Sequence, residues 1–189
     1  TLVIAGGIRP GGGGGDLVIN ANGTIAFVNK PLDLAGATFW TDSGGVTVLG
    51  VANNSWGSTL VASGTLRLDV TNALPSATTL TVGVGYGPNG FLNLNGNSHT
   101  IGQLVSGTTL AGTRALTSPT PATLTVNQSA TSLYDGQING ALSLTKTGTG
   151  TLILSNSLST TTGDITVSNG TLVVAIASSL GNSTNVAVT

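Results

Sequence analysis

The side chains in this sequence that are suited to acid–base or nucleophilic chemistry are few and scattered. All six acidic residues are Asp, His99 is the single histidine, and there is no Cys. Enzymes that cleave polysaccharides, such as lyases and glycosidases, need clustered carboxylates or a carboxylate beside Arg or Lys. Asp16 and Asp33 are separated by about one turn of the coil inferred below, but six Asp spread along such a coil will meet by chance. We therefore predict no catalytic residue and interpret the carboxylates as solvated surface groups.

His99 and two glycine-rich motifs are the remaining candidates for a binding site. We interpret His99, within Asn97–Gly102, as a structural or exposed imidazole and not as a catalytic base or ligand. The segment Gly85–Gly90 matches a dinucleotide-binding fingerprint, but a predicted strand follows it where that motif needs a helix. The segment Gly11–Ile19 matches a single calcium-binding nonapeptide, which needs tandem copies. We interpret both motifs as turns or loops and expect no cofactor and no metal.

The charge content excludes several classes of partner. Only 6% of residues are charged and the formal net charge is −1. Without a basic stripe, the surface is unsuited to nucleic acid or anionic lipid headgroups. The longest apolar run, 172–177, is far shorter than the roughly 20 residues that span a bilayer. We expect neither nucleic-acid binding nor membrane insertion, and stability must come from packing because no disulfide can form.

The elements that this sequence predicts are short strands. Strong helix formers are scarce, and apolar and polar residues alternate with the period of two that marks a half-buried strand. Gly, Asn, Ser and Thr separate nearly all the runs, as expected for turns. The predicted strands are 17–19, 24–28, 46–48, 65–70, 80–82, 91–94, 124–126, 142–144, 151–154, 165–167 and 171–174.

An internal repeat favours a solenoid over a sandwich of hairpins. A shift of 106 positions aligns residues 38–82 with residues 144–188 without a gap. It superposes turn glycines and the aliphatic residues that follow them, such as Gly64–Leu66 on Gly170–Leu172. We predict one domain, residues 1–189, and interpret the chain, which starts at Thr1, as a processed product or a piece of a longer one.

Several segments resemble a known family. Residues 144–155, 163–167 and 170–174 closely resemble the passenger-associated repeat of bacterial autotransporters. Residues 92–96 and 100–104 are similar to another stretch found in those passengers. The resemblance implies an all-β, right-handed parallel β-helix that is exported to the bacterial cell surface, where its stem presents or spaces functional loops.

A coil of this kind has predictable dimensions. Each turn of roughly 20 residues pairs its strands with the turns above and below, and its aliphatic side chains stack into one core. The chain would then make about nine turns and form a rod of ~40–45 Å, because stacked strands are ~4.8 Å apart. In Thr65–Val70 the leucines point inward, so Arg67 and Asp69 should share the outer face as a weak surface pair.

These features predict a non-catalytic extracellular element, either a rigid stem or a filament-building unit. Both termini look like strands, so we expect self-association or stacking through the terminal coils. The alternative is an adhesin-type module that recognises a glycan or another surface; the aromatic residues are a candidate sugar platform, although core filling is the stronger interpretation. Ice binding through the Thr-x-Thr pairs at 79–81, 123–125 and 145–147 is disfavoured by their irregular spacing.

Overall fold

The computed structural model describes residues 1–6, 8, 15–83, 89–107 and 113–189, which form sixteen strands and one short 3-10 helix. None of the described helical segments is both long and apolar enough to cross a bilayer. The strands are β1 (Leu2–Ile4), β2 (Leu17–Ile19), β3 (Thr24–Phe27), β4 (Thr38–Leu49), β5 (Ser58–Leu68), β6 (Thr79–Val82), β7 (Asn89–Asn93), β8 (His99–Ile101), β9 (Gln103–Ser106), β10 (Thr113–Asn127), β11 (Ser132–Tyr134), β12 (Gln137–Thr147), β13 (Thr151–Leu154), β14 (Ile165–Val167), β15 (Thr171–Val174) and β16 (Val186–Val188). The helix is η1 (Ala177–Leu180).

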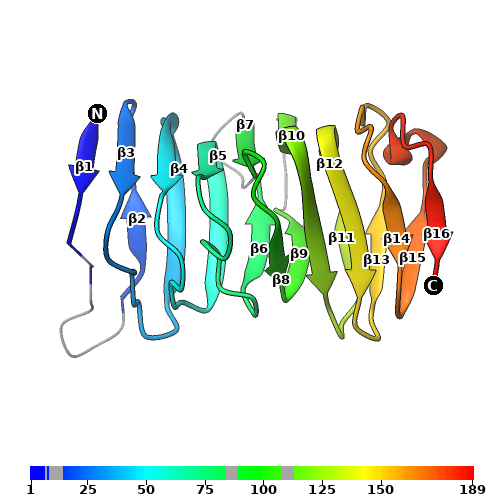
Figure 1. Ribbon diagram of the computed structural model, residues 1–189, viewed down its shortest axis with the longest axis horizontal. Helices are drawn as coiled ribbons and strands as arrows, with labels where there is room; N and C mark the ends of the chain where they lie inside the picture. Colours follow the sequence, from blue (N-terminus) through cyan, green and yellow to red (C-terminus); the bar gives the residue numbers. More distant parts are fainter. Residues whose placement is uncertain (7, 9–14, 84–88, 108–112) are drawn as a thin grey trace.

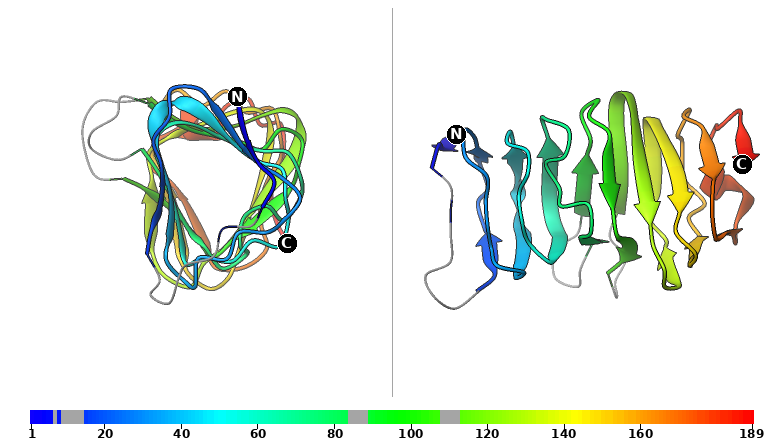
Figure 2. Two further views of the ribbon diagram at one scale, coloured as in Figure 1. Left: turned by 90° about the vertical axis from the view of Figure 1, so that its left-hand side faces the viewer. Right: turned by 60° about the horizontal axis from the view of Figure 1, so that its bottom comes forward.

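The strands stack in parallel along one axis. Pairing runs from β1 through β3, β4 and β5 to β16, and the two termini lie at opposite ends of the rod (Figure 1). Seen from the N-terminal end, the chain turns clockwise as it recedes, so the coil is right-handed (Figure 2). The predicted all-β, right-handed parallel β-helix is therefore confirmed, with about eight turns against the nine expected.

Three faces enclose the core, and each turn visits them in order. The first face is built from β2, the first halves of β4 and β5, and then β6, β9, β11, β13 and β15. The second face is built from β1, β3, the second halves of β4 and β5, β7, and the first halves of β10 and β12. The third face contains β8, the second halves of β10 and β12, β14 and β16.

The period-two pattern decides which side chains fill the core. In β7, Leu92 is fully buried, whereas its neighbours Phe91 and Asn93 are half-exposed. Leu92 stacks between Leu66 and Leu116 of the adjacent turns. Because such columns remove aliphatic surface from water at every level, hydrophobic burial stabilises the coil relative to an open sheet.

Aromatic side chains reinforce the N-terminal half of this core. Phe27 meets Phe39 edge to face at a centroid distance of 6.1 Å, and Phe39 stacks on Trp56 at 4.8 Å. All three are buried, as is Tyr134 further along the rod. Core filling is thus the role of these four aromatic residues, while Tyr86 lies outside the described residues.

The length of a turn varies more than the sequence suggests. Val46 and Thr65, which pair directly, are 19 positions apart, whereas Gly64 and Gly90 are 26 apart. The strands keep their register because the corners and loops absorb the difference. Gly64 and Gly170, which the internal repeat aligns, both adopt positive φ at a corner, with φ of 71° and 73°.

Candidate functional site

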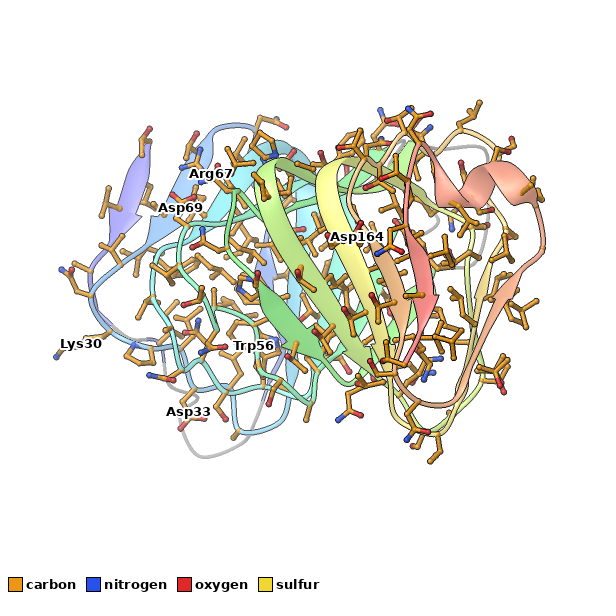
Figure 3. All side chains as sticks on the ribbon, turned by 45° about the vertical axis from the view of Figure 1, so that its right-hand side comes forward. Lys30, Asp33, Trp56, Arg67, Asp69 and Asp164 are labelled. Carbon is orange, nitrogen blue, oxygen red and sulfur yellow. The ribbon has the colours of Figure 1, made fainter. Side chains whose placement is uncertain are left out.

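The two carboxylates considered from the sequence each accept a hydrogen bond from a backbone amide. Asp16 accepts one from the amide of Thr38, 22 positions later, at 2.8 Å, and Asp33 accepts one from the amide of Ala35 at 3.2 Å. Asp33, Asp69 and Asp164 lie at well-separated places on the rod (Figure 3). Asp16 thus joins two successive turns, and Asp33 holds its own turn.

The expected pair of Arg67 and Asp69 is present on the outer face of β5 and the corner after it. The guanidinium donates from Nε at 2.7 Å and from Nη2 at 2.8 Å, and Asn95 of the next turn adds a third hydrogen bond at 2.9 Å. Hydrogen bonding from Arg67 lowers the pKa of the Asp69 carboxyl. Both side chains are well exposed, so the pair contributes little to stability and joins two turns at the surface.

A second Arg–Asp pair was not apparent from the sequence. Arg114 contacts Asp135 at 3.0 Å and donates to the carbonyl of Gly107 at 2.8 Å. Ser106 donates to Asp135 at 2.5 Å and accepts from its amide at 2.7 Å. The members come from β9, β10 and the turn after β11, so only the coil brings them together. With one carboxylate the cluster lacks the second acid of a glycosidase, and its bonds tie two successive turns together.

His99 has a structural role. Its imidazole is 3% exposed; Nε2 accepts a hydrogen bond from the amide of Ala73 at 3.2 Å, and Nδ1 donates to the carbonyl of Asn97 at 2.8 Å. Burial lowers the pKa of the ring. Both nitrogens are therefore used by the backbone, in agreement with the structural interpretation made from the sequence.

Lys146 is the buried charge that the sequence analysis missed. It exposes none of its surface, and its ammonium donates to the carbonyls of Thr147, of Gly148 at 2.8 Å and of Asn169 at 3.4 Å. Burial lowers its pKa. The signal was present, because Leu142, Leu144 and Lys146 alternate and the period of two directs all three inward. Lys146 closes a corner of the coil by satisfying its carbonyl groups.

The two glycine-rich motifs fall largely outside the described residues. Only Gly15–Ile19 of the calcium-like motif and Asn89 and Gly90 of the dinucleotide-like motif are described. Within the described parts of the chain, no group of three or more His, Cys, Asp or Glu residues is arranged to hold a metal ion.

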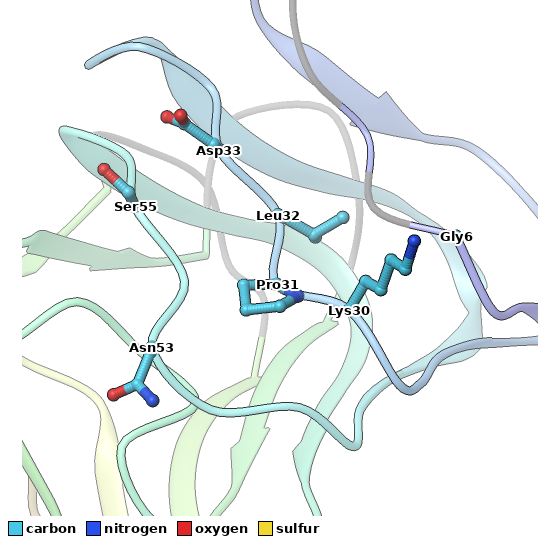
Figure 4. A pocket seen from close by; sticks show the side chains of 7 residues that line it. All are labelled: Gly6, Lys30, Pro31, Leu32, Asp33, Asn53 and Ser55. Carbon is cyan, nitrogen blue, oxygen red and sulfur yellow. The ribbon is translucent and has the colours of Figure 1, made fainter.

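A hollow of about 590 Å³ lies near the N-terminal end of the rod. Its lining residues are Gly6, Lys30, Pro31, Leu32, Asp33, Asn53 and Ser55. Lys30 points toward Gly6, whereas the carboxylate of Asp33 points the other way (Figure 4). The two charges therefore do not converge on one point as they would in an acid–base site.

The most regular surface feature is a column of threonines on the third face. Thr100 pairs with Thr125, Thr125 with Thr145, and Thr145 with Thr166. We call these four residues the threonine ladder. All four are half-buried and outward, because the buried positions of their strands alternate with them. Separations of 25, 20 and 21 positions conceal this column in the sequence.

Polar side chains flank the threonine ladder. Ser98 accepts from the amide of Thr123 at 3.0 Å, and Ser143 accepts from the amide of Asp164 at 3.1 Å. The pairs at 123–125 and 145–147 thus belong to one surface, whereas the pair at 79–81 lies on the first face. The third face therefore presents ordered hydroxyl groups over successive turns, with Asp164 as an acidic residue at its margin.

Comparisons with known proteins agree with this architecture. The passenger-associated transport repeat matches residues 144–174. Over 175 residues, 92% of this chain, the sequence is 29% identical to the adhesin BmaC autotransporter of Brucella suis biovar 1 (strain 1330). The chain spans about 4% of the length of that relative. No solved structure matches the chain. The repeat and the relative support a β-helix similar to those of autotransporter passengers, at the bacterial cell surface.

Proposed function

We propose that this chain is a non-catalytic stem segment, a rigid rod whose terminal coils stack on further coils. One observation carries the proposal: the inward columns of the core continue to both ends of the rod and are left bare there. A solenoid end normally needs a cap or another unit, because it presents unpaired backbone and apolar side chains.

The N-terminal end shows this in β1. Leu2 stacks on Ile25, and Ile4 stacks on the fully buried Phe27, so both continue core columns. Leu2 is nevertheless 56% exposed. The only ladder that β1 forms among the described residues is the one to β3, which leaves its other edge free for a further strand.

The C-terminal end repeats the arrangement in β16. Val186 stacks on Ile165 and Val188 on Val167, again in line with the core. Their exposed fractions are 51% and 84%. A further parallel coil placed here would bury both valines and supply partners for the outer edge of the strand.

Hydrogen exchange tests this proposal directly. We would compare the isolated 189-residue chain with the intact surface protein or assembly purified from its bacterium. The amides of β1 and β16 should exchange rapidly in the isolated chain and be protected in the native material, whereas β7 should be protected in both. Equal and rapid exchange of the terminal strands in the native material would show that nothing stacks there.

The threonine ladder supports a second candidate, an adhesin-type module that recognises a hydroxylated surface such as a glycan or ice. The relative from Brucella is named an adhesin, which describes that protein. A glycan array and an ice-recrystallisation assay would test the candidate, with Thr145→Lys as the variant and Thr65→Lys, also outward and half-buried but on the second face, as the matched control. Binding that only Thr145→Lys removes would support it, and no binding in either assay would end it.

A further inference from the structure

The first face carries an outward row of apolar side chains along the length of the rod. One residue occupies the same outward position at each level, and seven of the eight are apolar. The row, here called the apolar stripe, consists of Val18, Trp40, Leu60, Thr81, Val105, Leu133, Ile153 and Val173. Strand pairing aligns the residues from Val18 to Val105 with one another, and likewise those from Leu133 to Val173. The two groups meet where β9 lies against β11.

The fold itself does not require these side chains to be apolar. The core beneath them is filled by the alternating inward residues, such as Phe39, Leu80 and Leu152, which are fully buried. The outward positions of the second face include Arg67 and Asn93 as well as Phe91, and those of the third face include the threonine ladder. Single exposed aliphatic residues are ordinary on protein surfaces, but a contiguous row marks an interaction surface.

Solvent reaches much of the apolar stripe. The exposed fractions are 45% for Val18, 45% for Leu133 and 40% for Val173. Trp40 is half-buried, and its indole Nε1 has no hydrogen-bond partner among the described residues, whereas that of Trp56 donates to Thr59 at 2.8 Å. Large aromatic residues of this kind are the usual energetic anchors of protein interfaces.

We infer that the apolar stripe is a lateral interface, and that its occupant is the apolar stripe of a second copy of this chain. The area of the first face fits a homodimer: eight strands at ~4.8 Å, each contributing about four residues, cover roughly 500 Å² per copy, with the stripe at the centre. Roughly 1,000 Å² in total is the lower limit for a specific interface, and longer rods of the same kind would add to it.

Charge and spacing also fit a second copy. The outward column on one side of the stripe contains Thr38, Ser58, Thr79 and Gln103, which are uncharged. The acidic residues Asp16, Asp42 and Asp135 lie beside the stripe at different levels of the rod, so charge is confined to its margins. Both copies present side chains at the same strand interval, so the rows interlock as in two packed β-sheets. This surface is separate from the terminal coils, and the inference does not depend on the proposed stacking there.

Sedimentation velocity tests the interface once end-to-end contacts are removed. We would place Leu2→Lys and Val188→Lys in the chain to charge both ends, and then compare Ile153→Lys on the stripe with Thr65→Lys on the second face. Both test positions are outward and half-buried. The end-charged chain and its Thr65→Lys form should dimerise, and Ile153→Lys should weaken the dimer by about tenfold or more.

Two results would overturn the inference: an end-charged chain that stays monomeric at every concentration reached, or a dimer that Ile153→Lys leaves as tight as Thr65→Lys does. Disulfide cross-linking gives an independent reading because the native chain has no Cys. Leu60→Cys and Leu133→Cys should cross-link between copies, each with itself if the rods are parallel and with each other if they are antiparallel, whereas Thr65→Cys should not. Equal cross-linking at Thr65→Cys would place the contact elsewhere.

Discussion

The imidazole of His99 accepts a hydrogen bond from the backbone amide of Ala73, 26 positions earlier and one turn away in the coil. The same ring donates to Asn97, which fixes a neutral tautomer with the proton on Nδ1. Because an imidazolium has no lone pair on Nε2, protonation would break the bond to Ala73. His99 thus joins two turns only while it is neutral.

The stability of the protein should therefore fall on mild acidification. The pKa of His99 is lowered in the folded state, while the unfolded chain takes up its proton near pH 6.5. Between the two pKa values the unfolded state binds more protons than the folded state. The contribution of His99 to the free energy of unfolding is therefore complete above about pH 6.5 and decreases as the pH falls below it. Urea unfolding of the native chain and of His99→Gln, measured at pH 7.5 and pH 5.5, should show the smaller pH effect in the variant. Equal pH effects would contradict the role given to His99.

Replacement of the buried ammonium should destabilise the corner after β12. Lys146→Met keeps most of the stem but leaves the carbonyls of Thr147 and Gly148 without this donor, which should cost about 1–3 kcal/mol of unfolding free energy. Chemical denaturation measures the change. Lys30→Met, at an exposed lysine, is the control and should have little effect; similar losses for both would show that the carbonyl contacts contribute nothing.

The aliphatic columns should account for much of the stability. Leu92→Ala opens a cavity between Leu66 and Leu116 and should lower the unfolding free energy by about 2–5 kcal/mol. Asn93→Ala, the outward neighbour, should change it far less. Thermal and urea unfolding of the two variants would reveal the difference, and a Leu92→Ala protein as stable as the control would mean that the column is not tightly packed.

A corner glycine should be irreplaceable where two turns come close. A Cβ at Gly163 would lie 2.4 Å from the carbonyl carbon and oxygen of Leu142, so Gly163→Ala must push two backbone segments apart. We expect a loss of about 1–3 kcal/mol or more. A Cβ at Gly23 meets nothing within 4 Å, and Gly23→Ala should be close to neutral. Circular dichroism melts would compare them; matching melting temperatures would contradict the close contact at Gly163.

The main features of the fold were predictable because they depend on local patterns. Alternation in segments such as 91–94 indicated which side chains face inward, and the outward pair of Arg67 and Asp69 followed from the same rule. The period of two would also have placed Lys146 inside, although the sequence analysis did not apply it there; its carbonyl partners were not predictable because Asn169 belongs to the next turn. The cluster of Arg114, Ser106 and Asp135 could not be predicted either, because its members come from successive turns.

The sequence by itself determined many of the strands and turns, although not β8, β9 or β11, together with the parallel coil and the resemblance to autotransporter passengers. Only the tertiary structure decided which residues share a surface. The shift of 106 positions carries Thr38, on the first face, to Leu144, on the third face, so the aligned segments occupy different sides of the rod. Turn lengths vary because the loops at the corners can lengthen without disturbing the paired strands. The number of residues in each turn therefore decides which residues of successive turns pair, as Thr125 does with Thr145. The sequence specifies each strand locally, while the register between turns emerges only when the whole coil has been wound.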